Sequence, residues 1–191
     1  MLAGLLAVFL YWKHDAKNPP GFHDMRVFSS SSFISLVDPR DTAVRSLAEQ
    51  LRTPEAAYLY VRDRIRYVPM MPTESPGKIL RGGSASCLGK AALLCSLYRA
   101  MGIPPSNVRI VTGNVALGER LADHAWIDLE YKGACLQQDP SGFLGMFHFA
   151  QFPGMEFTRF FVQEEDFCFN DKEFAVISQL NRFRQVVSGG S

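Results

Sequence analysis

Apolar residues recur every three or four positions in the first half of the chain, which is the spacing of amphipathic helices. Asp38-Pro39 combines an N-cap residue with a helix-start proline and predicts a helix that ends near Leu51. Thr53-Pro54-Glu55 repeats this signal and predicts a second helix that runs to about Ile65. The apolar positions that would form the buried faces of the two helices are Ala43, Val44, Leu47, Ala48, Leu51, Tyr58, Val61 and Ile65.

Proline and glycine then recur through residues 69–83, which predicts a long irregular loop. A loop of this length inside a compact domain is more often functional than not. Ser86 follows as an N-cap for a third helix from Cys87 to about Met101, and Gly102 stands where helices commonly end. The predicted buried stripe of this helix contains Leu88, Ala91, Leu94, Cys95 and Tyr98.

Strand-like segments replace the helical pattern in the second half of the chain. Three strands are predicted over 108–115, 124–131 and 134–139. Lys132-Gly133 is a two-residue turn that joins the last two strands into an antiparallel hairpin. The residues on either side of this turn are therefore expected to pair with each other.

The chain is unusually aromatic from Phe143 onward, where it holds eleven of its fifteen phenylalanines. Further strands are predicted over 157–162 and 167–169. Asn170 begins a capping-box pattern that predicts a final helix through Phe183. Core packing is the expected use of these rings, and a partner-binding surface is the alternative.

Composition and charge exclude several classes of protein. With 191 residues, of which 47% are hydrophobic and 20% charged, the chain is expected to fold as one globular domain with short appendages. A net charge of +1 leaves no basic excess to displace phosphate counterions, which excludes a dedicated nucleic-acid binder. The four cysteines are far apart and form no C-x-x-C pair, so we expect neither a metal site nor a disulfide framework.

The two ends of the chain differ in composition from its middle. Residues 1–12 are an apolar run that, as a helix, would rise about 18 Å, short of the roughly 30 Å membrane core. Three interpretations of Met1–Trp12 stay open: an interfacial membrane anchor, part of a membrane helix, and a helix docked on the domain. The first two interpretations imply membrane contact through this segment, and we favour a membrane-associated or cell-envelope location over a cytoplasmic one. A linker is predicted over 13–37, then one domain over 38–187 with a Phe-rich extension from about 143, and a flexible tail over 188–191.

Cys87, His124 and Asp139 are the residues whose positions point to chemistry. A cysteine at a helix N-terminus faces unpaired backbone N–H groups and the positive end of the helix dipole, which favour the thiolate form. His124 opens a strand, and the hairpin register places Asp139 opposite Trp126, so that imidazole and carboxylate become diagonal neighbours on one face. The alternative for Cys87 is a small buried apolar side chain, which is the role we assign to Cys95.

These residues and the motifs around them resemble the transglutaminase-like superfamily. The resemblance covers about residues 55–142, and its motifs are Tyr67, Cys87 at a helix start, Arg99-Ala100-x-Gly102-Ile103-Pro104, His124-Ala125-Trp126 and Asp139-Pro140. It implies an α+β, papain-like core in which the catalytic helix packs against an antiparallel β-sheet. It also implies Cys87 as nucleophile, His124 as base and acid, and Asp139 as the carboxylate that orients the imidazole.

The expected activity is thiol acyl chemistry on a peptide or glutamine amide, with no cofactor. Cys87 would attack the carbonyl with its own backbone N–H as one oxyanion donor, and the sequence identifies no second donor. Trp126, on the strand of His124, is the candidate substrate-binding residue. We favour transfer to water, which defines a cysteine protease or amidase acting on a peptide or protein. The alternatives are transglutaminase-type transfer to an amine and a catalytically silent peptide-binding domain.

Overall fold

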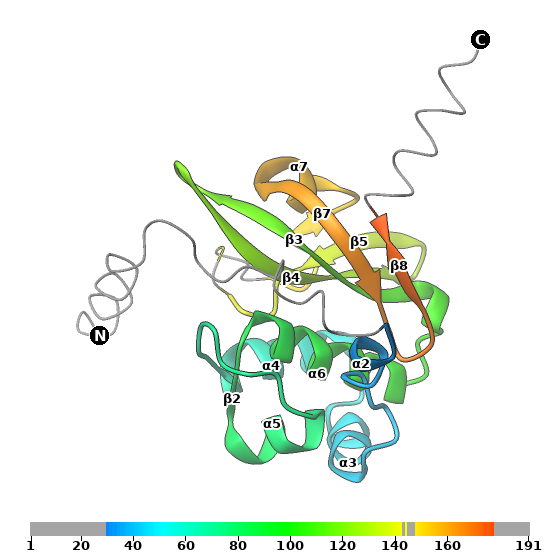
Figure 1. Cartoon of the computed structure of the whole chain (residues 1–191). Coiled ribbons are helices and arrows are strands. Elements are labelled where there is room, and N and C mark those ends of the chain that lie inside the picture. Colours follow the sequence, from blue (N-terminus) through cyan, green and yellow to red (C-terminus); the bar gives the residue numbers. More distant parts are fainter. Residues whose placement is uncertain (1–29, 143, 145–147, 178–191) are drawn as a thin grey trace.

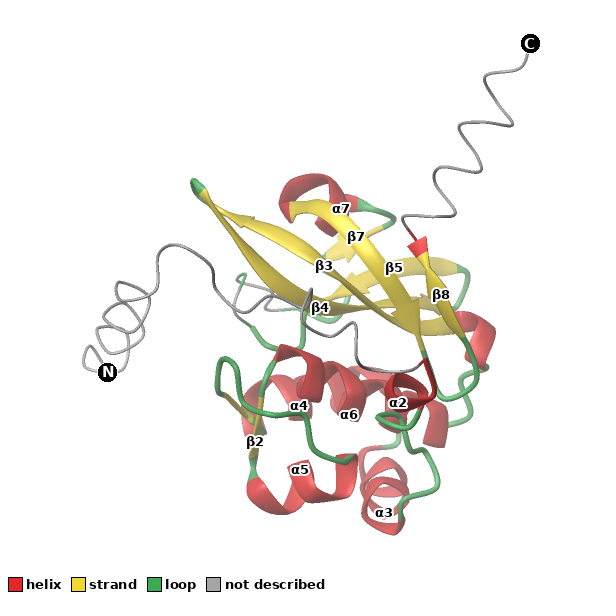
Figure 2. Ribbon diagram, in the orientation of Figure 1, coloured by secondary structure: helices red, strands yellow, loops and turns green. Residues whose placement is uncertain are grey.

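The computed structural model describes residues 30–142, 144 and 148–177, which form a layer of helices packed against a sheet (Figure 1). The helices are α2 (Ser30–Ile34), α3 (Thr42–Leu51), α4 (Pro54–Arg64), α5 (Pro76–Gly82), α6 (Cys87–Ala100), the 3-10 helix η2 (Pro105–Asn107) and α7 (Glu156–Phe161). The strands are β1 (Arg66–Tyr67), β2 (Ser84–Ala85), β3 (Val108–Leu117), β4 (Arg120–Tyr131), β5 (Ala134–Gln138), β6 (Phe152–Pro153), β7 (Val162–Phe169) and β8 (Phe174–Val176). Helices α2 to α6 lie on one side of the large sheet and α7 lies on the other (Figure 2). The expected α+β class is confirmed.

Six strands form one antiparallel sheet in the order β6-β5-β4-β3-β7-β8. The central β3–β4 pairing is the longest and runs from Val108 opposite Leu129 to Leu117 opposite Arg120. The strands β1 and β2 form a separate parallel pair of two residues each. Because β4 has a partner on each side, its side chains are positioned by two hydrogen-bond ladders.

The β4–β5 hairpin has the register that the sequence predicts. Tyr131 pairs with Ala134, directly next to the turn. Lys132 and Gly133 have φ angles of 51° and 77°, and two consecutive positive φ angles are typical of a type I′ turn. The five residues of β5 then bring Asp139 to the point at which the chain leaves the sheet.

Helix α6 is the centre of the helical layer. All of its residues from Cys87 to Tyr98 are buried, so the predicted apolar stripe was too narrow. The helix contacts α3, α4 and α5 as well as β3 and β4. Small side chains make this possible: a Cβ atom on Gly89 would approach the Cβ of Ala85 to 2.9 Å. The predicted N-cap is confirmed, because the Ser86 hydroxyl accepts a hydrogen bond from the Gly89 N–H.

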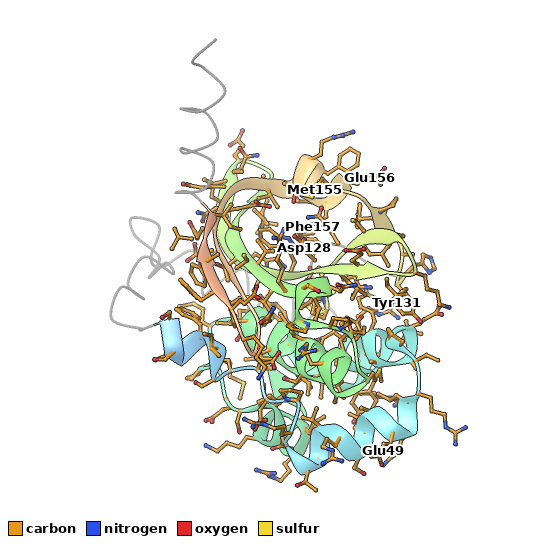
Figure 3. All side chains as sticks on the ribbon, turned by 90° about the vertical axis from the view of Figure 1, so that its right-hand side faces the viewer. Glu49, Asp128, Tyr131, Met155, Glu156 and Phe157 are labelled. Atoms are coloured by element: carbon orange, nitrogen blue, oxygen red, sulfur yellow. The ribbon has the colours of Figure 1, made fainter. Side chains whose placement is uncertain are left out.

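Two apolar clusters cover the two faces of the sheet. The larger cluster lies between the helical layer and the sheet and includes Ile127 and Leu129. The smaller cluster includes Trp126 and Phe157, the latter from α7. Figure 3 shows Phe157 between α7 and the sheet. Alternation along β4 therefore sends successive side chains to different clusters, as expected for a strand covered on both faces.

Both helices predicted in the N-terminal part are present. Helix α4 begins at Pro54 with Thr53 as its N-cap, as predicted. Helix α3 has Asp41 rather than Asp38 as its N-cap, because the Asp41 carboxylate accepts hydrogen bonds from two N–H groups of the first turn, at 2.8 and 3.2 Å. Asp38 therefore lies outside the helix that it was expected to cap.

Two segments predicted as irregular contain regular structure. Residues 69–83 include the whole of α5, which begins at Pro76 and leads into β2. The linker predicted over 13–37 contains α2, whose Phe33 is buried with its ring centroid 4.6 Å from that of Phe167. Pro76 of the predicted loop is the first residue of α5, and Ser30 of the predicted linker is the first residue of α2.

The Phe-rich extension differs most from the prediction. The strand predicted over 157–162 is wrong, because all but its last residue belong to α7. The strand predicted over 167–169 is confirmed as the end of β7. The final helix is wrong at Phe174–Val176, which form β8 and pair with β7. The Asn170 side chain does accept hydrogen bonds from the N–H groups of Lys172 and Glu173, as a helix cap would. The turn that it forms nevertheless joins two antiparallel strands. Residues 178–183 of that predicted helix lie outside the described residues.

The predicted membrane contact through Met1–Trp12 and the predicted tail 188–191 lie outside the described residues. Within residues 30–142, 144 and 148–177, no helix combines the length and the apolar character needed to cross a membrane.

Candidate active site

Cys87 is the first residue of α6 and comes two residues after the end of β2. Its relative exposure is 8%, so its side chain lies at the edge of the packed core. The N–H groups in the first turn of a helix have no carbonyl partner within that helix, and the helix dipole places partial positive charge there. The structure therefore places the sulfur where the sequence predicts it, at the positive end of a buried helix.

His124 and Asp139 lie side by side at the end of the β4–β5 hairpin. The distance from His124 Nε2 to Asp139 Oδ2 is 3.1 Å, and the two side chains are 2% and 0% exposed. The register explains this: β5 ends opposite Ile127, so the next residue along the chain reaches back toward the start of β4. The structure thus brings together an imidazole and a carboxylate that are fifteen positions apart in the sequence.

The imidazole links the thiol to the carboxylate. The side chain of Cys87 hydrogen bonds with the ring of His124, while Nε2 of the same ring faces Asp139. An imidazole has two nitrogens, so one ring can interact with a thiol and a carboxylate at the same time. The arrangement can move a proton between sulfur and imidazole while the carboxylate holds the ring in place.

The charges of this pair support each other. Burial alone would lower the pKa of His124, but the carboxylate of Asp139 and the side chain of Cys87 raise it from 6.5 to about 10. Burial likewise opposes ionisation of Asp139, but His124 and the hydrogen bonds from Ser141 hold the pKa of the carboxyl below its usual 3.8. At neutral pH the site therefore contains an imidazolium beside a carboxylate.

The turn after β5 encloses the Asp139 carboxylate. The Ser141 N–H donates to Oδ1 at 2.8 Å and the Leu144 N–H donates to Oδ2 at 3.4 Å. Asp139 thus receives backbone hydrogen bonds at both oxygens in addition to its contact with His124. Such a carboxylate has little freedom to rotate, which fixes the orientation of the imidazole.

Lys90, which the sequence analysis missed, attaches α6 to the end of α4. Its Nζ donates to the carbonyls of Ile65 at 2.7 Å and Arg62 at 3.0 Å. Burial lowers the pKa of Lys90 to about 8, while the charge of Asp139 acts in the opposite direction. A signal was present in the sequence, because Lys90 is the only lysine, arginine, aspartate or glutamate among residues 87–98.

Trp126 is not at the surface of this site, which corrects our expectation that it binds substrate. The residue is 0% exposed, and its ring centroid lies 5.4 Å from that of Phe157 on the α7 side of the sheet. The side chain therefore packs the smaller core, and we assign it a structural role.

The described part of the chain, residues 30–142, 144 and 148–177, has no group of three or more histidine, cysteine, aspartate or glutamate residues that could hold a metal ion.

The sequence matches the transglutaminase-like superfamily over residues 41–139, more than half of the chain, and the protein belongs to this superfamily. The matched region extends from the N-cap of α3 to Asp139 and so includes Cys87 and His124. Among solved structures, calcium-bound LapG of Legionella pneumophila is similar with a TM-score of 0.52 and 14% identity, covering 72% of this chain and 77% of that chain. A further structure of LapG from the same organism has the same score and identity, with coverage of 77% and 85%. These likenesses show a shared fold. No curated protein matches the sequence significantly.

Proposed function

We propose that the protein is a thiol-dependent hydrolase that cleaves an amide bond in a peptide or protein substrate. The observation that carries this proposal is the 3.1 Å contact between His124 and Asp139, next to a hydrogen-bonded cysteine at a helix start. Membership of the transglutaminase-like superfamily supports it, because the matched region contains all three residues in order. Cys87 is the nucleophile, His124 the acid and base, and Asp139 the group that orients the imidazole.

Acylation begins with a thiolate on Cys87 and an imidazolium on His124. The sulfur forms a bond to the substrate carbonyl carbon, and the electron pair of the carbonyl moves to its oxygen. The imidazolium donates its proton to the amide nitrogen as the carbon–nitrogen bond breaks, and the amine leaves. Asp139 keeps the ring aligned through both events because its own oxygens are held by the turn that follows β5.

Deacylation uses the neutral imidazole left by the first half of the reaction. His124 takes a proton from water while the water oxygen attacks the acyl carbon. Collapse of this second intermediate breaks the carbon–sulfur bond and releases a carboxylic acid. The thiolate and the imidazolium are then both restored, so the cycle balances without any other reactant.

The test is peptide cleavage in H₂¹⁸O followed by mass spectrometry. Hydrolysis places one ¹⁸O atom from solvent in each new carboxyl group, whereas transfer to an added primary amine leaves a new amide with no ¹⁸O. We expect the labelled acid from the wild-type protein and no cleavage by Cys87→Ala. Cys135→Ala is the matched control, because Cys135 is an exposed free cysteine on β5 and should be dispensable.

Two outcomes would contradict the proposal. An amide product in preference to the labelled acid would identify an acyl transferase. A wild-type protein that binds peptides without cleaving them, and whose Cys87 reacts with iodoacetamide no faster than Cys135, would identify a silent binding domain.

A further inference from the structure

The strand pair β1–β2 fixes Tyr67 next to the start of α6. Tyr67 is opposite Ala85 in this parallel pair, two residues before Cys87. Hydrogen bonds secure the backbone on both sides of the tyrosine: the Arg66 N–H donates to the Gly83 carbonyl at 2.8 Å, and the Val68 N–H to the Ala85 carbonyl at 2.9 Å. The position of Tyr67 is therefore coupled to that of the strand that leads into Cys87.

The side chain of Tyr67 lies within electrostatic range of the reactive groups. Its ring packs against the larger core cluster, of which Ala85 and Cys87 are members. Its hydroxyl lies in the electrostatic field of both Cys87 and Asp139. Burial, together with these two negative charges, holds the pKa of Tyr67 well above its usual value of 10. The hydroxyl therefore keeps its proton over the whole range in which the site would work.

The other polar side chains near the start of α6 have structural roles. The Ser86 hydroxyl is at the N-cap and accepts from the Gly89 N–H. The Lys90 ammonium donates to two carbonyls at the end of α4. The ring of His124 faces both Cys87 and Asp139. Tyr67 is half-buried, whereas His124 and Asp139 are buried, so the tyrosine is more accessible to solvent than these two residues.

We propose that the Tyr67 hydroxyl is the second donor of the oxyanion hole, together with the backbone N–H of Cys87. This inference rests on the proposed function and adds to it the group that stabilises the developing negative charge. As the thiolate adds to the carbonyl, the oxygen gains the electron pair, and a neutral O–H held in a largely dehydrated site stabilises that charge. No proton is transferred from the tyrosine, so the step balances as already described.

The test compares Tyr67→Phe with wild type in three assays. With a cleavable peptide, we expect kcat to fall by roughly 100-fold or more, the effect of removing one oxyanion donor, with KM within about twofold. A peptide aldehyde, which forms a tetrahedral oxyanion on the thiol, should bind more weakly by a similar factor. Alkylation of Cys87 by iodoacetamide displaces iodide without forming an oxyanion, so its rate should be unchanged. Tyr131→Phe is the matched control, because it removes a half-buried tyrosine hydroxyl at the far end of β4.

The outcomes of these assays separate a failure of the inference about Tyr67 from a failure of the proposed function. Equal kcat in Tyr67→Phe and wild type would overturn the inference and leave the proposed function intact. A parallel loss of alkylation and turnover in the variant would also overturn it, because the tyrosine would then be positioning the cysteine. A wild-type protein that alkylates at Cys87 but cleaves no peptide would overturn the proposed function itself.

Discussion

Replacing Asp139 by asparagine tests how the charge of the imidazole is maintained. Asparagine keeps the shape of the side chain and an oxygen for the ring, but it removes the negative charge that opposes the effect of burial on His124. The pKa of His124, raised to about 10 in the wild type, should then fall toward its usual 6.5, because only the side chain of Cys87 is left to oppose the effect of burial. At about pH 7.5 the protonated fraction of His124 would fall from nearly all molecules to roughly one in ten. The thiolate–imidazolium pair should become scarcer by at least this factor.

The assay is the rate of Cys87 alkylation by iodoacetamide, and of peptide cleavage, between about pH 5 and 10. In Asp139→Asn we expect both rates to fall by about tenfold or more at pH 7.5. The loss should become smaller toward pH 5.5, because His124 is then protonated even without the neighbouring carboxylate. Asp128→Asn is the control, since it removes a β4 carboxylate that pairs with Arg109. A wild-type pH profile in Asp139→Asn would refute the claim that this carboxylate sets the charge of His124.

Three further substitutions test the scaffold and the corrected role of Trp126. Arg99→Met should lower the free energy of unfolding by about 3 kcal/mol in urea titration, because Asp171, only 8% exposed, loses its 2.6 Å ion pair. Gly113→Ala should cost about 2 kcal/mol or more and weaken activity, since its Cβ would lie 2.0 Å from the Glu164 carbonyl oxygen and β7 would have to move. Trp126→Phe should lower thermal stability but leave the KM for peptides unchanged, and a large rise in KM would restore Trp126 as a substrate-binding residue.

The fold around the cysteine was predictable because its signals are local. The N-cap at Ser86 and the stop at Gly102 lie within one helix, and the turn at Lys132-Gly133 alone determines the hairpin register. That register is sufficient to bring His124 and Asp139 together, because a two-residue turn leaves no freedom in the pairing that follows. The main geometry of the candidate site was therefore contained in two short segments of sequence.

The parts that were missed depend on contacts distant in the sequence. The turn at Asn170 has a helix-capping pattern, but pairing of the following residues with β7 gives a strand. Lys90 was missed because its partners are the carbonyls of Arg62 and Ile65, which no side-chain pattern reveals. Trp126 was expected at the surface because nothing in the local sequence predicts that α7 covers that face of the sheet. In each case tertiary packing overrides a local preference.

Phe33 has a consequence for dividing this protein into fragments. Its ring lies 4.6 Å from that of Phe167 and 5.7 Å from that of Phe174, so a helix that precedes the superfamily match is joined to strands that follow it. A fragment trimmed to the match would lose α2 as well as β7 and β8, and with them this aromatic contact. It would also leave β3 as an unprotected sheet edge, prone to self-association. The smallest autonomous unit should therefore reach from α2 to β8, although the residues proposed for chemistry all lie well inside it.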